Sequence, residues 1–272
     1  SLFLGNRFFY LILQTLIIIK KKMKKMKLAA IFAGLVSVFT FSSCLNDGDS
    51  GPNYDLYEIV TVEDGSIFGG PVLKGDAWGY TYTPVASSVL AGLKASDGSY
   101  YKRVQVGIKL MEGEAITEGK KSYKVSEVGL IAILNYKDFK VQADTLNEYA
   151  LVSLEDSNNK IWAINGYVNV PFTFKTKEQL NMNDFHLYAV EAKEDTLVTR
   201  LRQTKGADDA YQTGGALISF HMPFNDMEFR DIFDQVVPKS DTIVVKVTAK
   251  GENDKELVST VKCSASNMQG SY

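Results

Sequence analysis

Histidines, nucleophilic turns and glycine-rich loops are the features that most often indicate catalysis in a sequence, and this chain has few of them. Its two histidines, His186 and His221, lie in strand-like context, and neither has metal-ligand spacing to another His or Cys. Either could act as a general base, but a histidine placed by strand alternation is more often part of a sheet face. The sequence has no G-x-S-x-G turn and no phosphate-binding glycine loop. We therefore expect a protein that is not an enzyme and needs no cofactor or metal, with an envelope hydrolase as the least favoured class.

Acidic residues cluster in the segment 223–236, where a carboxylate pair or a calcium site could be imagined. They are Asp226, Glu228, Asp231 and Asp234. Apolar residues recur at helical spacing in the same segment, which predicts a short amphipathic helix capped by Asn225 or Asp226. On a helix Asp231 and Asp234 share a face, whereas Asp226 and Glu228 diverge. A solvated polar face is therefore the better interpretation of these carboxylates.

The best candidate for a binding surface is an aromatic group in strand alternation, formed by Trp78, Tyr80 and Tyr82. Tyr100 and Tyr101 follow a nearby turn signal. Rings on one barrel face can stack on sugars or bases. The competing interpretation, packing in the core, is favoured, because no stripe of Arg or Lys supplies the electrostatic half of a nucleic-acid site.

Cys44 is the one residue to which the sequence assigns a specific chemistry. The chain from Met23 has a basic start, an apolar run over 28–41 and small residues that end at the cysteine, which is the layout of a secretory signal. The apolar run is 14 residues long, short of the roughly 20 that a spanning helix needs. Phe41-Ser42-Ser43-Cys44 resembles the lipobox of bacterial lipoproteins, in which the thiol is acylated, although Phe41 stands where Leu is usual. The alternative is an ordinary cleaved signal with a chance cysteine.

The segments on either side of this signal support the interpretation. Residues 45–53 are polar, acidic and rich in turn formers, so we expect a flexible tether beside the acyl site. Each buried methylene contributes about 0.8 kcal/mol, so several acyl chains can hold a domain to a bilayer. Residues 1–22 contain a second, interrupted apolar stretch and are interpreted as an upstream extension before the start at Met23 or Met26; a tandem hydrophobic hairpin is the alternative.

Composition and net charge limit the classes of partner that this chain is expected to bind. The chain has 272 residues, 45% of them hydrophobic, which is enough for a sizeable core. Its formal net charge is −2, but the first 44 residues contain seven basic residues and no acidic one, so the remainder is clearly acidic. An acidic chain is not expected to bind nucleic acid. With only two cysteines, Cys44 and Cys263, a disulfide scaffold is excluded, and Cys263 is expected to be a buried, unreactive thiol.

The mature chain is predicted to be mainly β, because apolar residues recur at every second position between turn formers. The clearest alternations after the aromatic group run over 104–110 and 243–247. Residues 54–140 read as five or six short strands with glycines where a small barrel must coil, which predicts an OB-like barrel domain.

A second domain is predicted over residues 141–272. Seven strand-like segments suggest an antiparallel β-sandwich, with the helix over 223–236 covering one open end. The expected strands are 149–154, 160–170, 185–191, 196–202, 216–222, 242–250 and 256–263. The predicted organisation is therefore an extension and signal over 1–43, a tether over 44–53, a barrel and a sandwich.

Taken in order, these features resemble the NigD-like lipoproteins of Gram-negative anaerobes. The resemblance covers Cys44 to Val261 and rests on the lipobox with its acidic tether, on the strands of 110–134 and on the Trp-containing segment 161–170. The family implies an OB-type barrel followed by a β-sandwich and a role in bacteriocin immunity. It supplies no catalytic residue.

Two functional hypotheses follow. The first is a non-enzymatic lipoprotein of the cell envelope, anchored in the outer membrane and either periplasmic or surface-exposed. Its partners would be the bilayer, through acylated Cys44, and a protein, either a bacteriocin or an envelope protein. The alternative is a module that binds a glycan or another envelope ligand through Trp78, Tyr80 and Tyr82.

Overall fold

The computed structural model describes residues 53–65, 70–141, 148–155, 160–177, 182–206 and 212–269. Cys44 and the signal segment lie outside these residues, so lipid attachment stays a prediction. Among the described residues, no helix has the length and apolar character needed to cross a membrane. All of them belong to one compact unit, which contains both the barrel and the sheets that follow it.

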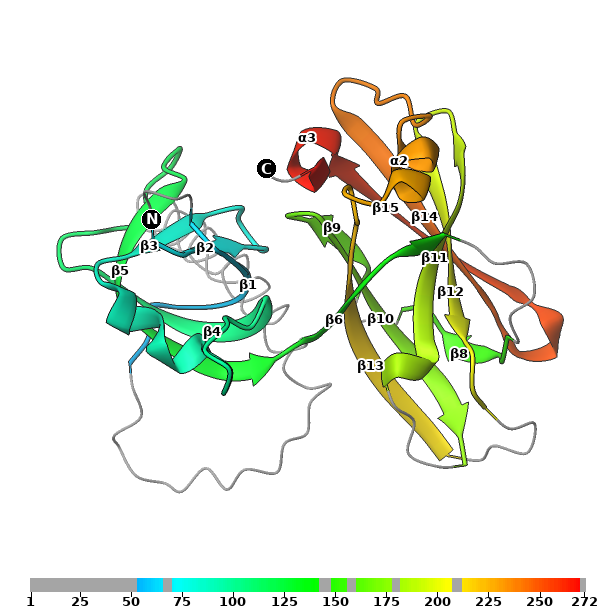
Figure 1. Cartoon of the computed structure of the whole chain (residues 1–272), viewed down its shortest axis with the longest axis horizontal. Coiled ribbons are helices and arrows are strands. Elements are labelled where there is room, and N and C mark those ends of the chain that lie inside the picture. Colours follow the sequence, from blue (N-terminus) through cyan, green and yellow to red (C-terminus); the bar gives the residue numbers. More distant parts are fainter. Residues whose placement is uncertain are drawn as a thin grey trace, which may run out of the picture. The chain divides into compact units, whose positions relative to one another are not determined.

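The first structural element is a closed five-stranded barrel, as the sequence predicted (Figure 1). Its strands follow the order β1-β2-β3-β5-β4. They are β1 (Leu56–Glu63), β2 (Val72–Gly75), β3 (Thr81–Pro84), β4 (Arg103–Leu110) and β5 (Ser122–Ile133), with a 3-10 helix, η1 (Ser87–Leu93), between β3 and β4. Val104, Val106 and Ile108 alternate along β4 and are fully buried, because these positions face the barrel interior. The predicted alternation over 104–110 is thus confirmed.

Two glycines form a slot on the outer side of the barrel. Gly107 of β4 and Gly129 of β5 lie opposite each other in the register, and a Cβ at either one would clash with the side chain of Tyr54. The neighbouring Asp55 donates its backbone N–H to the carbonyl of Ile108 over 2.9 Å, and its carboxylate accepts the N–H of Leu110 over 2.8 Å. The residues just before β1 are therefore held against β4 and β5.

Two further sheets follow the barrel, which confirms the predicted mainly β class. One has the order β6-β13-β10-β8, with β9 also paired to β10, and the other has the order β15-β14-β12-β11-β7. The first contains β6 (Asn135–Asp138), β8 (Leu151–Ser153), β9 (Trp162–Ile164), β10 (Tyr167–Thr176) and β13 (Gln212–His221). The second contains β7 (Lys140–Val141), β11 (Phe185–Lys193), β12 (Thr196–Gln203), β14 (Thr242–Lys250) and β15 (Glu256–Ser264). Most pairs are antiparallel, but β6 with β13, β7 with β11 and β12 with β14 are parallel.

The strand boundaries depart from expectation at three places. The strand expected over 160–170 is a hairpin, because Asn165 and Gly166 take positive φ angles of 52° and 78° and turn β9 into β10. Trp78 precedes β3 and so lies outside the strand that carries Tyr82. The sheet partner changes at Leu134, ahead of the boundary expected at residue 140, since β6 already pairs with β13. The division into domains itself stays a prediction.

Short helices complete the described chain. They are η2 (Met182–Asp184), α2 (Met227–Phe233), η3 (Glu252–Asp254) and α3 (Ala265–Gln269). The predicted amphipathic helix is present as α2, and the side chain of Asp226 caps it by accepting the N–H groups of Glu228 and Phe229. Its apolar face joins the core between the two sheets, where Phe229 packs against Phe139 and Phe224 at ring distances of 5.6 and 5.5 Å.

We expect Phe229→Ala to lower the free energy of unfolding by about 3–5 kcal/mol, because it empties a fully buried site among aromatic rings. Met227 lies on the same helix with 78% of its side chain exposed, so Met227→Ala should change stability by about 0.5 kcal/mol or less. Urea unfolding followed by circular dichroism measures both variants. Equal losses would show that α2 does not close the core in the way described.

Candidate functional site

The aromatic group singled out in the sequence divides between core and surface. Trp78 and Tyr80 are stacked with ring centres 5.9 Å apart and are half-buried. Tyr82 is fully buried, and Tyr123 of β5 packs against Tyr80 at 5.0 Å. The core interpretation therefore holds for Tyr82, and only Trp78 and Tyr80 of the three keep accessible surface. Lys121 reaches this group by donating to the carbonyl of Trp78 over 3.0 Å.

Behind the aromatic group lies a buried carboxyl that the sequence analysis did not single out. Glu58 of β1 accepts the hydroxyl of Tyr82 over 2.5 Å and the N–H of Ala77 over 2.7 Å. Burial raises the pKa of Glu58 to about 7, the hydrogen bonds from Tyr82, Ala77 and Trp78 oppose this rise, and the charge of Asp76 adds to it. Gly75 leaves room for the carboxyl, because a Cβ there would collide with it. Glu58 thus holds the turn 76–78 from the barrel interior.

The most extensive polar cluster surrounds Arg103, whose side chain is fully buried. Its guanidinium forms a bidentate ion pair with Asp76, over 2.9 Å to Oδ1 and 2.5 Å to Oδ2. It also donates to Thr61 of the barrel over 2.8 Å. Its remaining donors reach Asn169 over 2.8 Å and Ser219 over 3.3 Å, both in the sheet of β10 and β13. A single side chain therefore bonds the barrel to the following sheet.

The sheet presents polar residues to Arg103 because of its register. Asn169 of β10 pairs with Ser219 of β13, and residues paired in this way point to the same face. The hydroxyl of Ser219 donates to Oδ1 of Asn169 over 2.6 Å, and the ring of Tyr167 lies 4.8 Å from the guanidinium carbon of Arg103. Trp162 of β9 completes the cluster by donating to Asp76 over 2.8 Å. Hydrophobic residues at the alternate positions face the other side, into the core between the two sheets.

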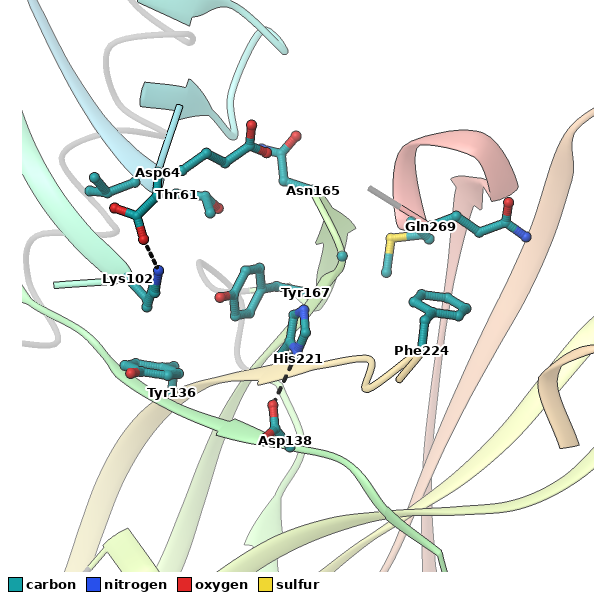
Figure 2. A pocket seen from close by; sticks show the side chains of 14 residues that line it. Thr61, Asp64, Lys102, Tyr136, Asp138, Asn165, Tyr167, His221, Phe224 and Gln269 are labelled. Atoms are coloured by element: carbon teal, nitrogen blue, oxygen red, sulfur yellow. Dashed lines mark hydrogen bonds and ion pairs between the residues drawn. The ribbon is translucent and has the colours of Figure 1, made fainter. Parts of the chain in front are cut away.

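A pocket of about 500 Å³ opens beside this cluster (Figure 2). Barrel residues on its wall are Thr61, Val62, Glu63, Asp64 and Lys102. The following sheets and α3 contribute Tyr136, Asp138, Asn165, Gly166, Tyr167, His221, Phe224, Met268 and Gln269. Volumes of this size are usual for sites that hold a small molecule.

An ion pair and a hydrogen bond join side chains on the wall of the pocket. Lys102 lies 2.9 Å from Asp64, and Nδ1 of His221 lies 3.0 Å from Asp138 (Figure 2). The ring of His221 also packs on Tyr167 at 5.0 Å, and burial raises the pKa of Tyr167 to about 12. All of these side chains except Tyr167 are substantially exposed. The pocket therefore presents donors and acceptors held by local partners, beside the apolar side chains of Val62, Phe224 and Met268.

The other residues considered from the sequence lie elsewhere. His186 of β11 is half-buried and does not line the pocket; burial, together with the charges of Lys137 and Lys140, lowers its pKa to about 4. Cys263 is buried, and burial raises its thiol pKa to about 12, as expected for a thiol that only packs. Within the ranges that the structure describes, no group of His, Cys, Asp and Glu is arranged to hold a metal ion.

The sequence contained signals for parts of the cluster and the pocket, one weak and one strong. Asn169 and Ser219 interrupt strands that are otherwise apolar, which indicates a sheet face in contact with something polar. Asn165-Gly166 is a strong hairpin signal that would have placed the turn at the pocket. No sequence pattern indicated that Arg103 pairs with Asp76, because the two residues meet only when the barrel closes.

Comparison with known proteins gives structural likeness without a family assignment. No protein-family model matches the chain, and no functionally curated protein matches it. A candidate toxin-related protein from Parabacteroides distasonis is 15% identical with a TM-score of 0.48, covering 79% of this chain and 96% of that chain. A candidate lipoprotein from Bacteroides fragilis is 12% identical with a TM-score of 0.46, covering 79% and 98%.

A NigD-like immunity protein from Bacteroides caccae is also among the matches. It is 17% identical with a TM-score of 0.41, covering 80% of this chain and 99% of that chain. The family that the sequence resembles is thus represented among the similar structures, and none of these three proteins is described as an enzyme. With identities and TM-scores this low, the likeness carries no conclusion about what the chain does.

Arg103→Met leaves the buried carboxylate of Asp76 without its partner, so we expect the free energy of unfolding to fall by about 3–5 kcal/mol. Lys102→Met is the matched control, because it removes the exposed pair with Asp64 at the adjacent position and should cost about 1 kcal/mol or less. Urea denaturation monitored by fluorescence separates the two. A cost for Arg103→Met no larger than that of the control would contradict a central role for the cluster.

Glu58 should give the protein a measurable pH dependence. Its folded pKa of about 7 exceeds the ordinary value of 4.5, so between these limits the native state binds more protons than the unfolded state. Stability should therefore fall by about 3 kcal/mol as pH rises through this window, and Glu58→Gln should remove that part of the slope. Denaturant midpoints across the window measure it. The exposed Glu118→Gln should keep the original slope, and an unchanged slope in Glu58→Gln would refute the assignment.

Proposed function

We propose that this chain is a non-enzymatic lipoprotein of the cell envelope that acts by binding another protein, with bacteriocin immunity as its specific role. The observation that carries the proposal is Cys44, which ends a basic and apolar signal and precedes a polar, acidic tether. The immunity role comes from the NigD-like resemblance of the sequence.

The described residues support a binding role over catalysis. The ionisable side chains that are most deeply buried have structural partners. Arg103 pairs with Asp76, and Glu58 accepts hydrogen bonds from Tyr82 and Ala77. Cys263 is buried with a raised pKa, so it is a poor nucleophile. His221 bonds to Asp138, and no Ser, Thr or Cys is hydrogen-bonded to its ring within the described chain. These features favour a rigid scaffold that presents surfaces.

We place the protein at the outer membrane, on its periplasmic or its outer surface, with the bilayer as a partner through acylated Cys44. The protein partner is a bacteriocin or an envelope protein, and nucleic acid is not a partner. The acidic character of the chain beyond the signal supports the exclusion of nucleic acid.

A glycan or other envelope ligand is the second candidate. The stacked pair of Trp78 and Tyr80 favours it, because both rings keep accessible surface and Tyr80 has Lys121 over its ring at 5.2 Å. Tyr82, the third residue of the predicted surface, contributes through packing.

The anchoring proposal is tested by replacing the proposed acyl site. Cys44→Ala should release the protein from the membrane fraction and abolish labelling with palmitate, because no other thiol is proposed to carry lipid. Cys263→Ala is the matched control and should keep both properties, since its thiol is buried. Membrane association of Cys44→Ala equal to that of the unmodified protein would rule out this anchor.

The immunity role needs a separate measurement. Cells that lose the gene should become more sensitive to a bacteriocin encoded nearby, and restoring the intact chain should reverse the change. Unchanged sensitivity to every such bacteriocin would remove immunity from the proposal and leave the anchor untouched.

A further inference from the structure

The pocket beside Arg103 has no role in the proposal above, and its wall combines aromatic, apolar and hydrogen-bonding side chains. Tyr136 and Asp138 lie two positions apart on β6, so they share a face of the sheet. Their register partners on β13 are Ser219 and His221. This register brings an aromatic ring, a carboxylate and an imidazole to the pocket wall from adjacent strands, and Figure 2 shows the rings of Tyr136 and Tyr167 at separate places on this wall.

Tyr136 is the ring on this wall that is available for stacking. Its side chain is 48% exposed, and within the described part of the chain no other ring packs on it. Tyr167, by contrast, is buried between Arg103, at 4.8 Å, and His221, at 5.0 Å. A half-exposed tyrosine at a pocket wall offers an apolar face and a hydroxyl to the same ligand.

The charges on the wall restrict the class of ligand. Lys102 and His221 are each matched to a carboxylate, and Glu63 has no partner among the described residues. An anionic ligand would meet these carboxylates, which disfavours phosphate, nucleic acid and acidic peptides. An apolar ligand would remove these two hydrogen-bonded pairs from water without replacing their bonds to water.

Hydroxyl groups both donate and accept, so a ligand rich in hydroxyls can bond at once to the carboxylates, the Lys102 ammonium and the His221 imidazole of this wall. Its C–H faces can in turn cover an aromatic ring. We propose that this pocket binds a neutral saccharide, stacked on Tyr136, with hydroxyls bonded to the His221–Asp138 and Lys102–Asp64 pairs. This site is distinct from the stacked Trp78 and Tyr80 of the barrel and does not depend on the lipid anchor.

Saturation-transfer NMR on the full-length chain in detergent tests the proposal, with maltotriose, cellotriose, chitotriose and mannotriose as probes and spermidine as a cationic comparison. At least one trisaccharide should receive saturation from the protein, and spermidine should not compete with it. Absence of transfer to all four at millimolar concentration, or binding of spermidine alone, would overturn the proposal.

Variants then locate the site. Tyr136→Ala should weaken binding by about tenfold or more, and Tyr136→Phe should retain most of it because the ring remains. Asp138→Asn should also weaken binding, and the exposure of both residues means that the fold should survive, as thermal melting will show. Tyr57→Ala is the control: it removes a ring that is also 48% exposed but lies outside the pocket, and it should bind as the unmodified protein does. Binding lost in Trp78→Ala and kept in Tyr136→Ala would assign the saccharide to the barrel and refute this pocket.

Discussion

A guanidinium has five N–H donors, and each one that is buried without an acceptor destabilises the fold. Arg103 makes five hydrogen bonds, to both oxygens of Asp76 and to Thr61, Asn169 and Ser219. Its partners come from the barrel and from the sheet that follows, so the pairing requires both to be formed. Hydrophobic contacts between the barrel and the sheet would tolerate small shifts, whereas the directional hydrogen bonds of a guanidinium specify one arrangement. The positions of the turn 76–78, the hairpin of β9 and β10 and the pocket wall all depend on this interaction.

The same interaction connects two features that are distant along the chain. The carboxylate of Asp76 accepts hydrogen bonds from Trp162 of β9 as well as from Arg103. The turn that carries Asp76 is held in turn by Glu58, which lies inside the barrel and accepts the N–H of Ala77. A carboxyl whose pKa lies near neutrality therefore supports the turn that supplies the counter-ion of Arg103. Local chemistry inside the barrel and the contact between barrel and sheet are parts of one network.

Sequence patterns predicted what depends on local order. The alternation around Val106 gave the barrel strand, the spacing of apolar residues gave α2, and the overall class followed from both. The patterns missed what depends on contacts between distant residues: Arg103 with Asp76, and the parallel pairing of β12 with β14. They also missed the turn at Asn165-Gly166, because the apolar residues on both sides of it were interpreted as one strand over 160–170. Of the candidate site, the aromatic group was found but partly belongs to the core, and the pocket wall was not found, because strands from separate segments assemble it.

Tyr54, seated over Gly107 and Gly129, has a mechanical consequence. It lies two residues before β1, so a force applied to the preceding chain is transmitted to the barrel at this slot. The ring must leave the slot, and Asp55 must give up its bonds to Ile108 and Leu110, before β1 can begin to peel from β4. The load is thereby shared by two strands instead of concentrating on the first pair of the ladder. A protein held at its amino-terminal side would resist unravelling from that end, and the replacement of either glycine by a larger residue would weaken this protection before it affected the core.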